Sequence, residues 1–164
     1  MGTIDNFVSA LTIGARANMF NVVVDNIDSK LDFLCKATSL PGKSIGIIEV
    51  PYLADTVKIA GDNQFEDWQI TVLADEDFVI RQQIIDWMEE IKKSDDAAGQ
   101  DDLTYFRTAT VAHLNRDNTQ NGNAMYKFYN MWPSSIDPVD LVFDSKDTII
   151  EYGVTFSFSH WLPE

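Results

Sequence analysis

The plainest structural signal in the sequence is the stretch Ile150-Glu151-Tyr152-Gly153-Val154-Thr155-Phe156-Ser157-Phe158-Ser159. Apolar side chains take every second position, and small polar or acidic residues lie between them. This period of two is that of a β-strand, because successive side chains point to opposite faces of a sheet. The stretch therefore predicts a strand with one face on a hydrophobic core and the other face toward water.

Similar patterns elsewhere predict about eight strands in total. Asn121-Gly122 is typical of a tight hairpin turn between two of them, and Trp132-Pro133-Ser134-Ser135 is expected to break the chain. The predicted strands cover residues 19–24, 30–38, 44–50, 56–60, 68–73, 104–115, 123–131 and 150–159.

One segment, residues 75–93, instead predicts a long amphipathic helix. Ile80, Ile84 and Trp87 recur at helical spacing, and Asp75 is suited to cap the N-terminus. The polar, acidic stretch 94–102 that follows is expected to be a solvated loop. We predict a mainly β protein, an antiparallel β-sandwich or barrel with one flanking helix, built as a single domain over residues 1–164.

Composition excludes several classes of protein. The chain has 164 residues, 45% of them hydrophobic, which is ordinary for one globular domain. Its 12 Lys and Arg against 26 Asp and Glu give a net charge of −14. This charge argues against a protein that binds nucleic acid tightly. With Cys35 as the single cysteine, an internal disulfide is impossible. No signal peptide or membrane-spanning stretch is expected.

Motifs that carry catalysis are weak. Gly42-Lys43-Ser44-Ile45-Gly46 matches the pattern of a nucleophile elbow, and Asp144 and His160 follow in hydrolase order. That motif requires a strand, a sharp turn and then a helix, whereas Ser44 opens a β-rich run. We therefore expect Ser44 to be structural and the protein not to be an enzyme.

Signals for metals and reactive thiols are equally weak. Residues 117–122 resemble half of a calcium loop, but Phe128 stands where the last acidic ligand is required. His113 and His160 alone do not make a metal site, and Cys35 is expected to be a core residue. No cofactor and no metal are predicted.

Three segments, in order, carry a specific resemblance. The first is Cys35-Lys36-Ala37-Thr38-Ser39-Leu40-Pro41. The second is Ala60-Gly61-Asp62-Asn63-Gln64-Phe65-Glu66-Asp67-Trp68-Gln69-Ile70-Thr71-Val72, followed by Asp75, Glu76, Arg81 and Trp87. The third is Trp132-Pro133 with the closing strand to Trp161. With these motifs the chain resembles the tail tube proteins of contractile-tailed, T-even-like bacteriophages over nearly its whole length.

The resemblance implies a structural subunit. In that family six subunits close into a ring, four strands from each subunit join into an inner β-barrel, and stacked rings form a hollow conduit for DNA ejection inside a contractile sheath. The expected partners are copies of the chain itself, the sheath, baseplate and tail terminator proteins, and the tape measure protein in the lumen; DNA passes without specific binding. The implied location is the virion tail, after assembly in the host cytoplasm.

Candidate functional residues follow from this resemblance. The hairpin 44–60 is similar to the ring-stacking element of the family, and residues 1–18 are expected to form an N-terminal arm that orders at a contact. Acidic residues could line the lumen and repel phosphate, or face the sheath. The stacking candidates are Ile45, Ile47, Ile48, Val50, Val57 and Ile59, and the acidic candidates are Glu151, Glu66, Asp67, Glu89 and Glu90.

Two alternatives stay open on the sequence alone. One is the inner tube of a phage-like injection or secretion system, which would share the fold. The other is a single β-sandwich module that binds a carbohydrate or peptide through exposed aromatic side chains.

Overall fold

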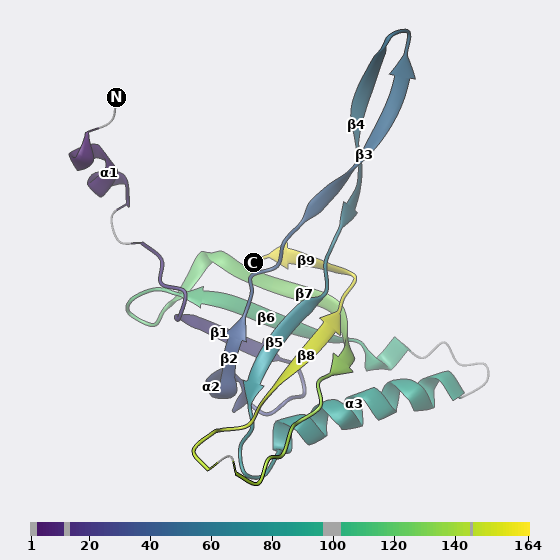
Figure 1. Cartoon of the computed structure of the whole chain (residues 1–164). Helices are drawn as coiled ribbons and strands as arrows, with labels where there is room; N and C mark the ends of the chain where they lie inside the picture. Colours follow the sequence, from purple (N-terminus) through teal and green to yellow (C-terminus); the bar gives the residue numbers. More distant parts are fainter. Residues whose placement is uncertain (1–2, 12–13, 97–102, 145) are drawn as a thin grey trace.

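The computed structural model describes residues 3–11, 14–96, 103–144 and 146–164 (Figure 1). This part of the chain is mainly β, as predicted. Its elements are α1 (Ile4–Leu11), β1 (Phe20–Val24), α2 (Leu31–Leu34), β2 (Cys35–Thr38), β3 (Ser44–Tyr52), β4 (Asp55–Gln64), β5 (Trp68–Leu73), α3 (Val79–Asp96), a 3-10 turn (Leu103–Tyr105), β6 (Arg107–Leu114), β7 (Gln120–Ile136), β8 (Glu151–Ser157) and β9 (His160–Pro163).

Strand β7 belongs to two sheet layers. Its first part pairs antiparallel with β6 on one side and with β9 on the other. Its last residues, from Trp132 to Ile136, pair with β8. We call the strands β1-β6-β7-β9 layer A and the strands β7-β8-β5-β2 layer B. The antiparallel sandwich or barrel expected from the sequence is thus present, with β7 as the strand that joins its layers.

The core lies between the two layers. The Trp68 ring stacks on Phe128 of layer A at a centroid distance of 4.5 Å and lies 5.7 Å from Phe156 of layer B. Trp68, Ile70 and Val72 of β5 are all buried. The alternation in the closing strand is confirmed, since Tyr152, Val154 and Phe156 are buried.

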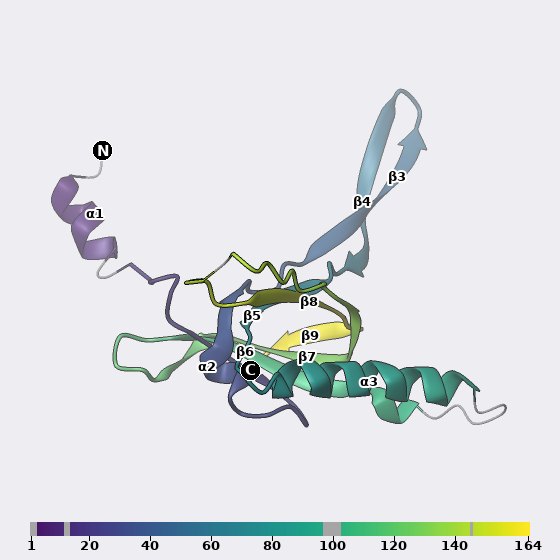
Figure 2. The same ribbon diagram turned by 60° about the horizontal axis from the view of Figure 1, so that its bottom comes forward.

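Helix α3 closes one side of this core (Figures 1 and 2). Ile80, Ile84 and Trp87 are at most 1% exposed, as helical spacing predicts. The Trp87 ring lies 6.0 Å from Phe156, and its Nε1 donates to the carbonyl oxygen of Tyr105 at 2.7 Å. The helix therefore packs on the inward side of layer B.

The predicted bounds of this helix, 75–93, are wrong at both ends. Phe78 has a positive φ of 51°, and its N–H donates to the carbonyl oxygen of Asp75. Asp75 therefore closes a turn rather than capping the helix, which begins at Val79 and continues to Asp96. Residues 94–96 of the predicted loop are helical, and the rest of that loop, 97–102, lies outside the described residues.

The predicted strand 30–38 is wrong in its first half. The Asp28 carboxylate accepts the N–H of Lys30 at 2.9 Å, which turns the chain into the short helix α2. Asp32 in this helix accepts hydrogen bonds from Asn21 Nδ2 and the N–H of Val22 in β1. Within this helix Leu31 is buried, whereas Phe33 is 85% exposed.

The break predicted at Trp132-Pro133-Ser134-Ser135 is also wrong. The register against β8 shifts between Pro133 and Ser135, which makes a bulge instead of an end. A bulge bends a strand while keeping it in the sheet, so β7 continues from one layer into the other.

Two segments project from this body. The hairpin β3–β4 rises far above the sheets, and α1 lies apart from them at the end of an extended arm (Figure 1). All residues of α1 are exposed. Among the described helices, none has the length and apolar character needed to cross a membrane.

Candidate functional site

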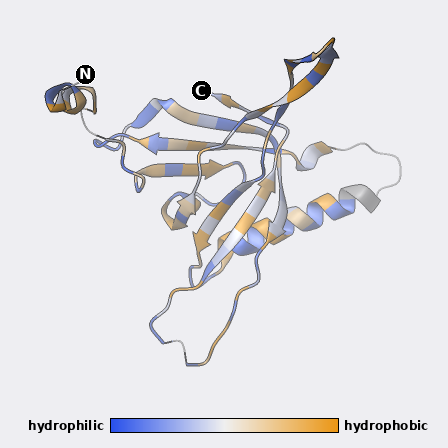
Figure 3. Ribbon diagram, turned by 45° about the horizontal axis from the view of Figure 1, so that its top comes forward, coloured by the Kyte–Doolittle hydropathy of each residue, from blue (hydrophilic) through white to orange (hydrophobic). Residues whose placement is uncertain are grey.

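The hairpin β3–β4 is rich in hydrophobic residues (Figure 3), and these side chains are exposed in the single chain. Ile48 pairs with Ile59, and Val50 pairs with Val57, so these four side chains share one face. Ile47 lies on the opposite face, because it is two residues from Glu49, and Ile45 lies beyond the register shift, toward the body. All six predicted stacking residues are between 42% and 66% exposed. A two-stranded ribbon is only marginally stable alone in water, so contact of this apolar surface with another chain would stabilise the hairpin.

At the base of the hairpin the backbones of β3 and β4 lie in close contact. A Cβ placed on Gly61 would lie 3.1 Å from the carbonyl oxygen of Gly46, and the register shifts between Ile45 and Ile47. The two strands therefore cross closely at this point, which directs the ribbon away from layer B.

Layer B presents a second candidate surface on its face away from the core. The register places Gln69 opposite Thr155, and Thr71 opposite Gly153, so most outward side chains are polar; Ala37, opposite Thr71, and Leu73, opposite Glu151, are apolar members of the same face. We call this the polar face; its residues are Lys36, Gln69, Thr71, Ser135, Glu151, Gly153, Thr155 and Ser157.

Both edges of layer B are unpaired within the described chain. Strand β2 pairs with β5 alone, and the β7 residues 132–136 pair with β8 alone. Unpaired edges offer backbone N–H and C=O groups to another strand. The layer thus has four strands with an open edge on each side.

The acidic candidates fall into two groups on opposite sides of the core. On the polar face, the Glu151 carboxylate pairs with Lys36 Nζ at 2.8 Å. At the end of the same face, Ser157 Oγ donates to Asp67 Oδ1 at 2.7 Å. Glu66 is exposed beside Asp67.

Glu89 and Glu90 form the other group, on the exposed side of α3. Glu90 lies 3.2 Å from Arg107, whose guanidinium stacks over the Trp87 ring at 4.2 Å. Since α3 packs on the inward side of layer B, these carboxylates and those of the polar face point away from each other.

The residues considered for chemistry have structural surroundings. Ser44 is the first residue of β3, and its hydroxyl donates to the carbonyl oxygen of Gln64 at 3.4 Å. His160 stacks on Tyr129. Asp117 accepts hydrogen bonds from the N–H and Oγ1 of Thr119, which lower the pKa of its carboxyl. No group of three possible metal ligands occurs among the residues described.

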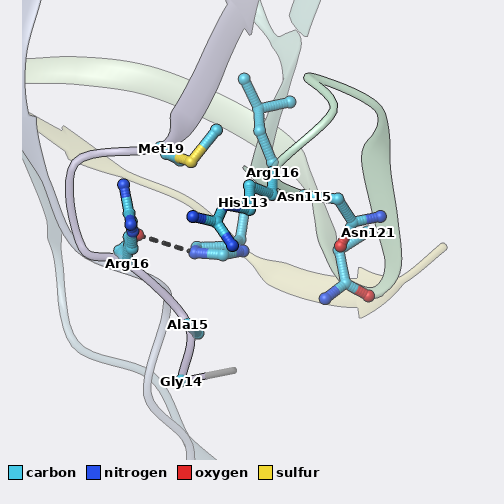
Figure 4. Close-up of a pocket in the computed structure, with 9 residues that line it drawn as sticks. Gly14, Ala15, Arg16, Met19, His113, Asn115, Arg116 and Asn121 are labelled. Carbon is cyan, nitrogen blue, oxygen red and sulfur yellow. Dashed lines mark hydrogen bonds between the residues drawn. The ribbon is translucent and has the colours of Figure 1, made fainter. Parts of the chain in front are cut away.

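A pocket of about 260 Å³ lies where the N-terminal arm meets the body (Figure 4). Arg16, Arg116 and His113 line it together with Met19 and Leu114. Sequence reasoning missed this site, because its two arginines lie far apart in the chain and no spacing rule connects them.

An uncovered apolar ribbon, open sheet edges and a polar face define a structural subunit that associates with copies of itself. The comparisons with known proteins agree with this class. The sequence model of the phage tail tube protein family matches residues 6–164, so the chain belongs to this family. It is a tail tube subunit, a non-enzymatic structural component of the virion tail.

Two relatives illustrate the similarity. The tail tube proteins gp19 of Enterobacteria phage T4 and of Enterobacteria phage T6 are each 29% identical over 161 residues, which covers 96% of this chain and 98% of each relative.

Solved structures share the fold. The chain superposes on a subunit from the sheath/tube terminator of an extracellular contractile injection system (PVC) with a TM-score of 0.68 at 15% identity, covering 92% of this chain and 96% of that one. A chain from the tube-terminating cap of the anti-feeding prophage gives a TM-score of 0.66 at 12% identity, covering 92% and 90%.

Proposed function

We propose that six copies of this chain close into a ring in which layer B becomes part of a continuous inner β-barrel. The observation that carries this proposal is the pair of open edges on layer B. Pairing the β2 edge of one copy with the β7 edge of the next satisfies both edges at once. A contact between two different surfaces of one chain closes into a ring when its rotation fits.

Stacking of rings is the proposed role of the hairpin β3–β4. Its face with Ile48, Ile59, Val50 and Val57 is uncovered in the single chain, and burial of apolar area is favourable by about 25 cal/mol per Å². The hairpin extends from layer B beyond the body (Figure 1). Contact with a second ring would bury this face, and the repetition would give a hollow tube.

The polar face is then the proposed wall of the bore. The hydroxyl and amide side chains of this face do not attract phosphate, the Lys36 cation is already paired with Glu151, and Asp67 adds negative charge. DNA ejection through this bore without specific binding is the function that this surface supports best. The tape measure protein would occupy the bore before ejection.

Glu89 and Glu90 on α3 are the proposed sheath-facing acids. They lie across the core from the polar face, which makes them an outer surface if the polar face is the bore. The structural neighbours come from assemblies that include a sheath, a terminator and a baseplate, and we extend these partners to this chain. Assembly in the host cytoplasm and ordering of the arm 1–18 at a contact are part of the same proposal.

Negative-stain electron microscopy of the concentrated protein tests the proposal directly. Rings or hollow rods are the expected result, alone or after seeding with tail fragments. Small monodisperse particles both with and without seeds would contradict it. Limited proteolysis tests the arm, which should be cleaved in the monomer and protected in the tube; equal cleavage in both states would oppose its ordering.

A further inference from the structure

The pocket at the base of the N-terminal arm concentrates positive charge in an acidic protein. Arg16, Arg116 and His113 line one cavity of about 260 Å³ (Figure 4), although the chain has only 12 Lys and Arg. Within the described ranges, neither Arg16 nor Arg116 has a carboxylate within ion-pair distance. Four other cations do: Lys30, Lys36, Lys58 and Arg107.

The backbone around this pocket is held in place. The carbonyl oxygen of Arg16 lies 2.9 Å from His113 Nε2, and it also accepts the N–H of Met19. The carbonyl oxygen of Met19 accepts the N–H of Leu114 at 2.9 Å. The backbone at Arg16 is therefore anchored to β6, beside the apolar side chains of Met19 and Leu114.

A segment of complementary chemistry lies between β7 and β8. Asp140 and Asp144 bracket the apolar residues Leu141, Val142 and Phe143. Phe143 is 98% exposed and Leu141 is 79% exposed, so this segment is uncovered in the single chain. Large exposed apolar side chains beside charges are typical of protein contact sites.

The pocket and this segment cannot meet within one chain. Asn121 in the pocket lies at the start of β7, whereas Asp140 follows the end of the same 17-residue strand. In Figure 1 the segment forms part of the loop at the bottom of the molecule, away from the arm. A pair of complementary surfaces at opposite ends of one chain makes a head-to-tail contact between copies.

We propose that the basic pocket receives the segment 140–144 of a second copy in the neighbouring ring. Arg16 and Arg116 pair with the carboxylates of Asp140 and Asp144, and the apolar residues between them pack against Met19 and Leu114. Arginine suits this contact because its planar guanidinium matches a carboxylate in two-point geometry. The inference rests on the proposed stacking of rings and adds a second, electrostatic contact to the apolar one.

A charge-swap series on the full-length chain tests this contact. The pocket variant is Arg16→Glu with Arg116→Glu, the segment variant is Asp140→Lys with Asp144→Lys, and the third variant combines all four changes. The control is Lys92→Glu with Lys93→Glu, which makes the same charge change as the pocket variant on exposed residues of α3. Tube formation is measured by sedimentation and electron microscopy under conditions in which the wild-type chain forms tubes.

We expect the pocket and segment variants each to lower the sedimenting fraction at least tenfold, with unchanged circular dichroism. The combined variant should recover most of it, and the control should behave as wild type. Normal tubes from either reversal would overturn the proposal, as would a combined variant that fails to recover. Failure of the wild-type chain to form any tube would count against the proposed function itself, so the two failures are distinguishable.

Discussion

At the scale of single residues, the reactivity of Cys35 is set by its buried position. It begins β2, is 6% exposed, and lies in the core cluster. Burial raises the pKa of its thiol to about 11, with a smaller raising effect from the Asp32 carboxylate. The thiolate is the nucleophilic form of cysteine, so the folded chain holds this group in its unreactive form at neutral pH.

Alkylation with iodoacetamide at pH 8 should therefore be slow. We expect the folded protein to react at least a hundredfold more slowly than the same chain in denaturant, where the pKa returns to its ordinary value near 8.5. Mass spectrometry over time measures both rates. Comparable rates in the two states would show that Cys35 is accessible and ionised as usual.

Trp87 is a second residue whose side-chain contacts contribute to the stability of the fold. Its indole Nε1 donates to the carbonyl oxygen of Tyr105, while Arg107 covers its ring. Trp87→Phe leaves that carbonyl without its partner and should lower the free energy of unfolding of the monomer by about 2 kcal/mol. Urea denaturation checks this value.

Trp132→Phe is the matched control for this change. In the part of the chain described, the Trp132 indole has no hydrogen bond, and its side chain is partly buried. We expect Trp132→Phe to lower the free energy of unfolding by less than half as much as Trp87→Phe does. Equal losses in the two variants would mean that the Tyr105 contact contributes nothing of its own.

At the scale of elements, the proposed stacking role of the hairpin β3–β4 would make assembly depend on residues that the fold of the monomer does not need. Its apolar face contributes nothing to the core cluster, so its side chains can change without loss of monomer stability. The opposite face holds the exposed pair Glu49–Lys58, whose atoms are 3.8 Å apart. Exposed pairs of this kind contribute at most about 1 kcal/mol.

Ile48→Ser with Val57→Ser should abolish tube formation while leaving thermal unfolding of the monomer within a few degrees of wild type. The reason is the loss of apolar area that only a second ring would bury. Glu49→Gln with Lys58→Gln changes the other face and should assemble normally. Tubes of normal yield from the serine variant would contradict the stacking role of this hairpin.

Elements with a long, regular hydrophobic pattern could be predicted from the sequence. Elements whose conformation depends on one hydrogen bond or one bulge could not. The alternation of Tyr152, Val154 and Phe156 indicated both strand and core face, because hydrophobic period and burial coincide there. The segment 30–34 also alternates, but the Asp28 carboxylate starts a helical turn instead. No local pattern predicted that Pro133 would lie in a bulge inside a continuous strand.

The candidate surfaces divide in the same way. The hairpin was predicted as a contact surface only through its resemblance to the ring-stacking element of the family, because its apolar composition alone also fits a core. The basic pocket depends on a tertiary fold that brings Arg16 beside Arg116. The sides of the acidic candidates could not be assigned from sequence, since Glu151 and Glu89 carry the same charge in different environments.

At the scale of the whole molecule, charge is distributed over two sides of one core. The Lys36–Glu151 pair partly neutralises the polar face, and α3 presents Glu89 and Glu90 on the other side. Electrostatic effects of such exposed groups are short-ranged, with a Debye length of about 8 Å at physiological salt. Each side should therefore act on its own neighbours.

Neutralising each side separately tests this division. Glu89→Gln with Glu90→Gln should weaken binding of the sheath protein to preformed tubes at least several-fold and leave DNA delivery through assembled tails unchanged. Asp67→Asn with Glu151→Gln should leave binding of the sheath protein unchanged and should slow DNA delivery. Cosedimentation and infectivity measure the two outcomes, and variants that affect neither function would contradict both assignments.

The continuity of β7 has a mechanical consequence. One polypeptide strand passes from layer A to layer B, and its bulge at Pro133 bends the strand without ending it. In the proposed ring, axial load on layer B would therefore reach layer A through covalent backbone and through hydrogen bonds on both sides of the strand. Shearing the two layers apart requires rows of these hydrogen bonds to break together, so the subunit is expected to resist deformation as one stiff body.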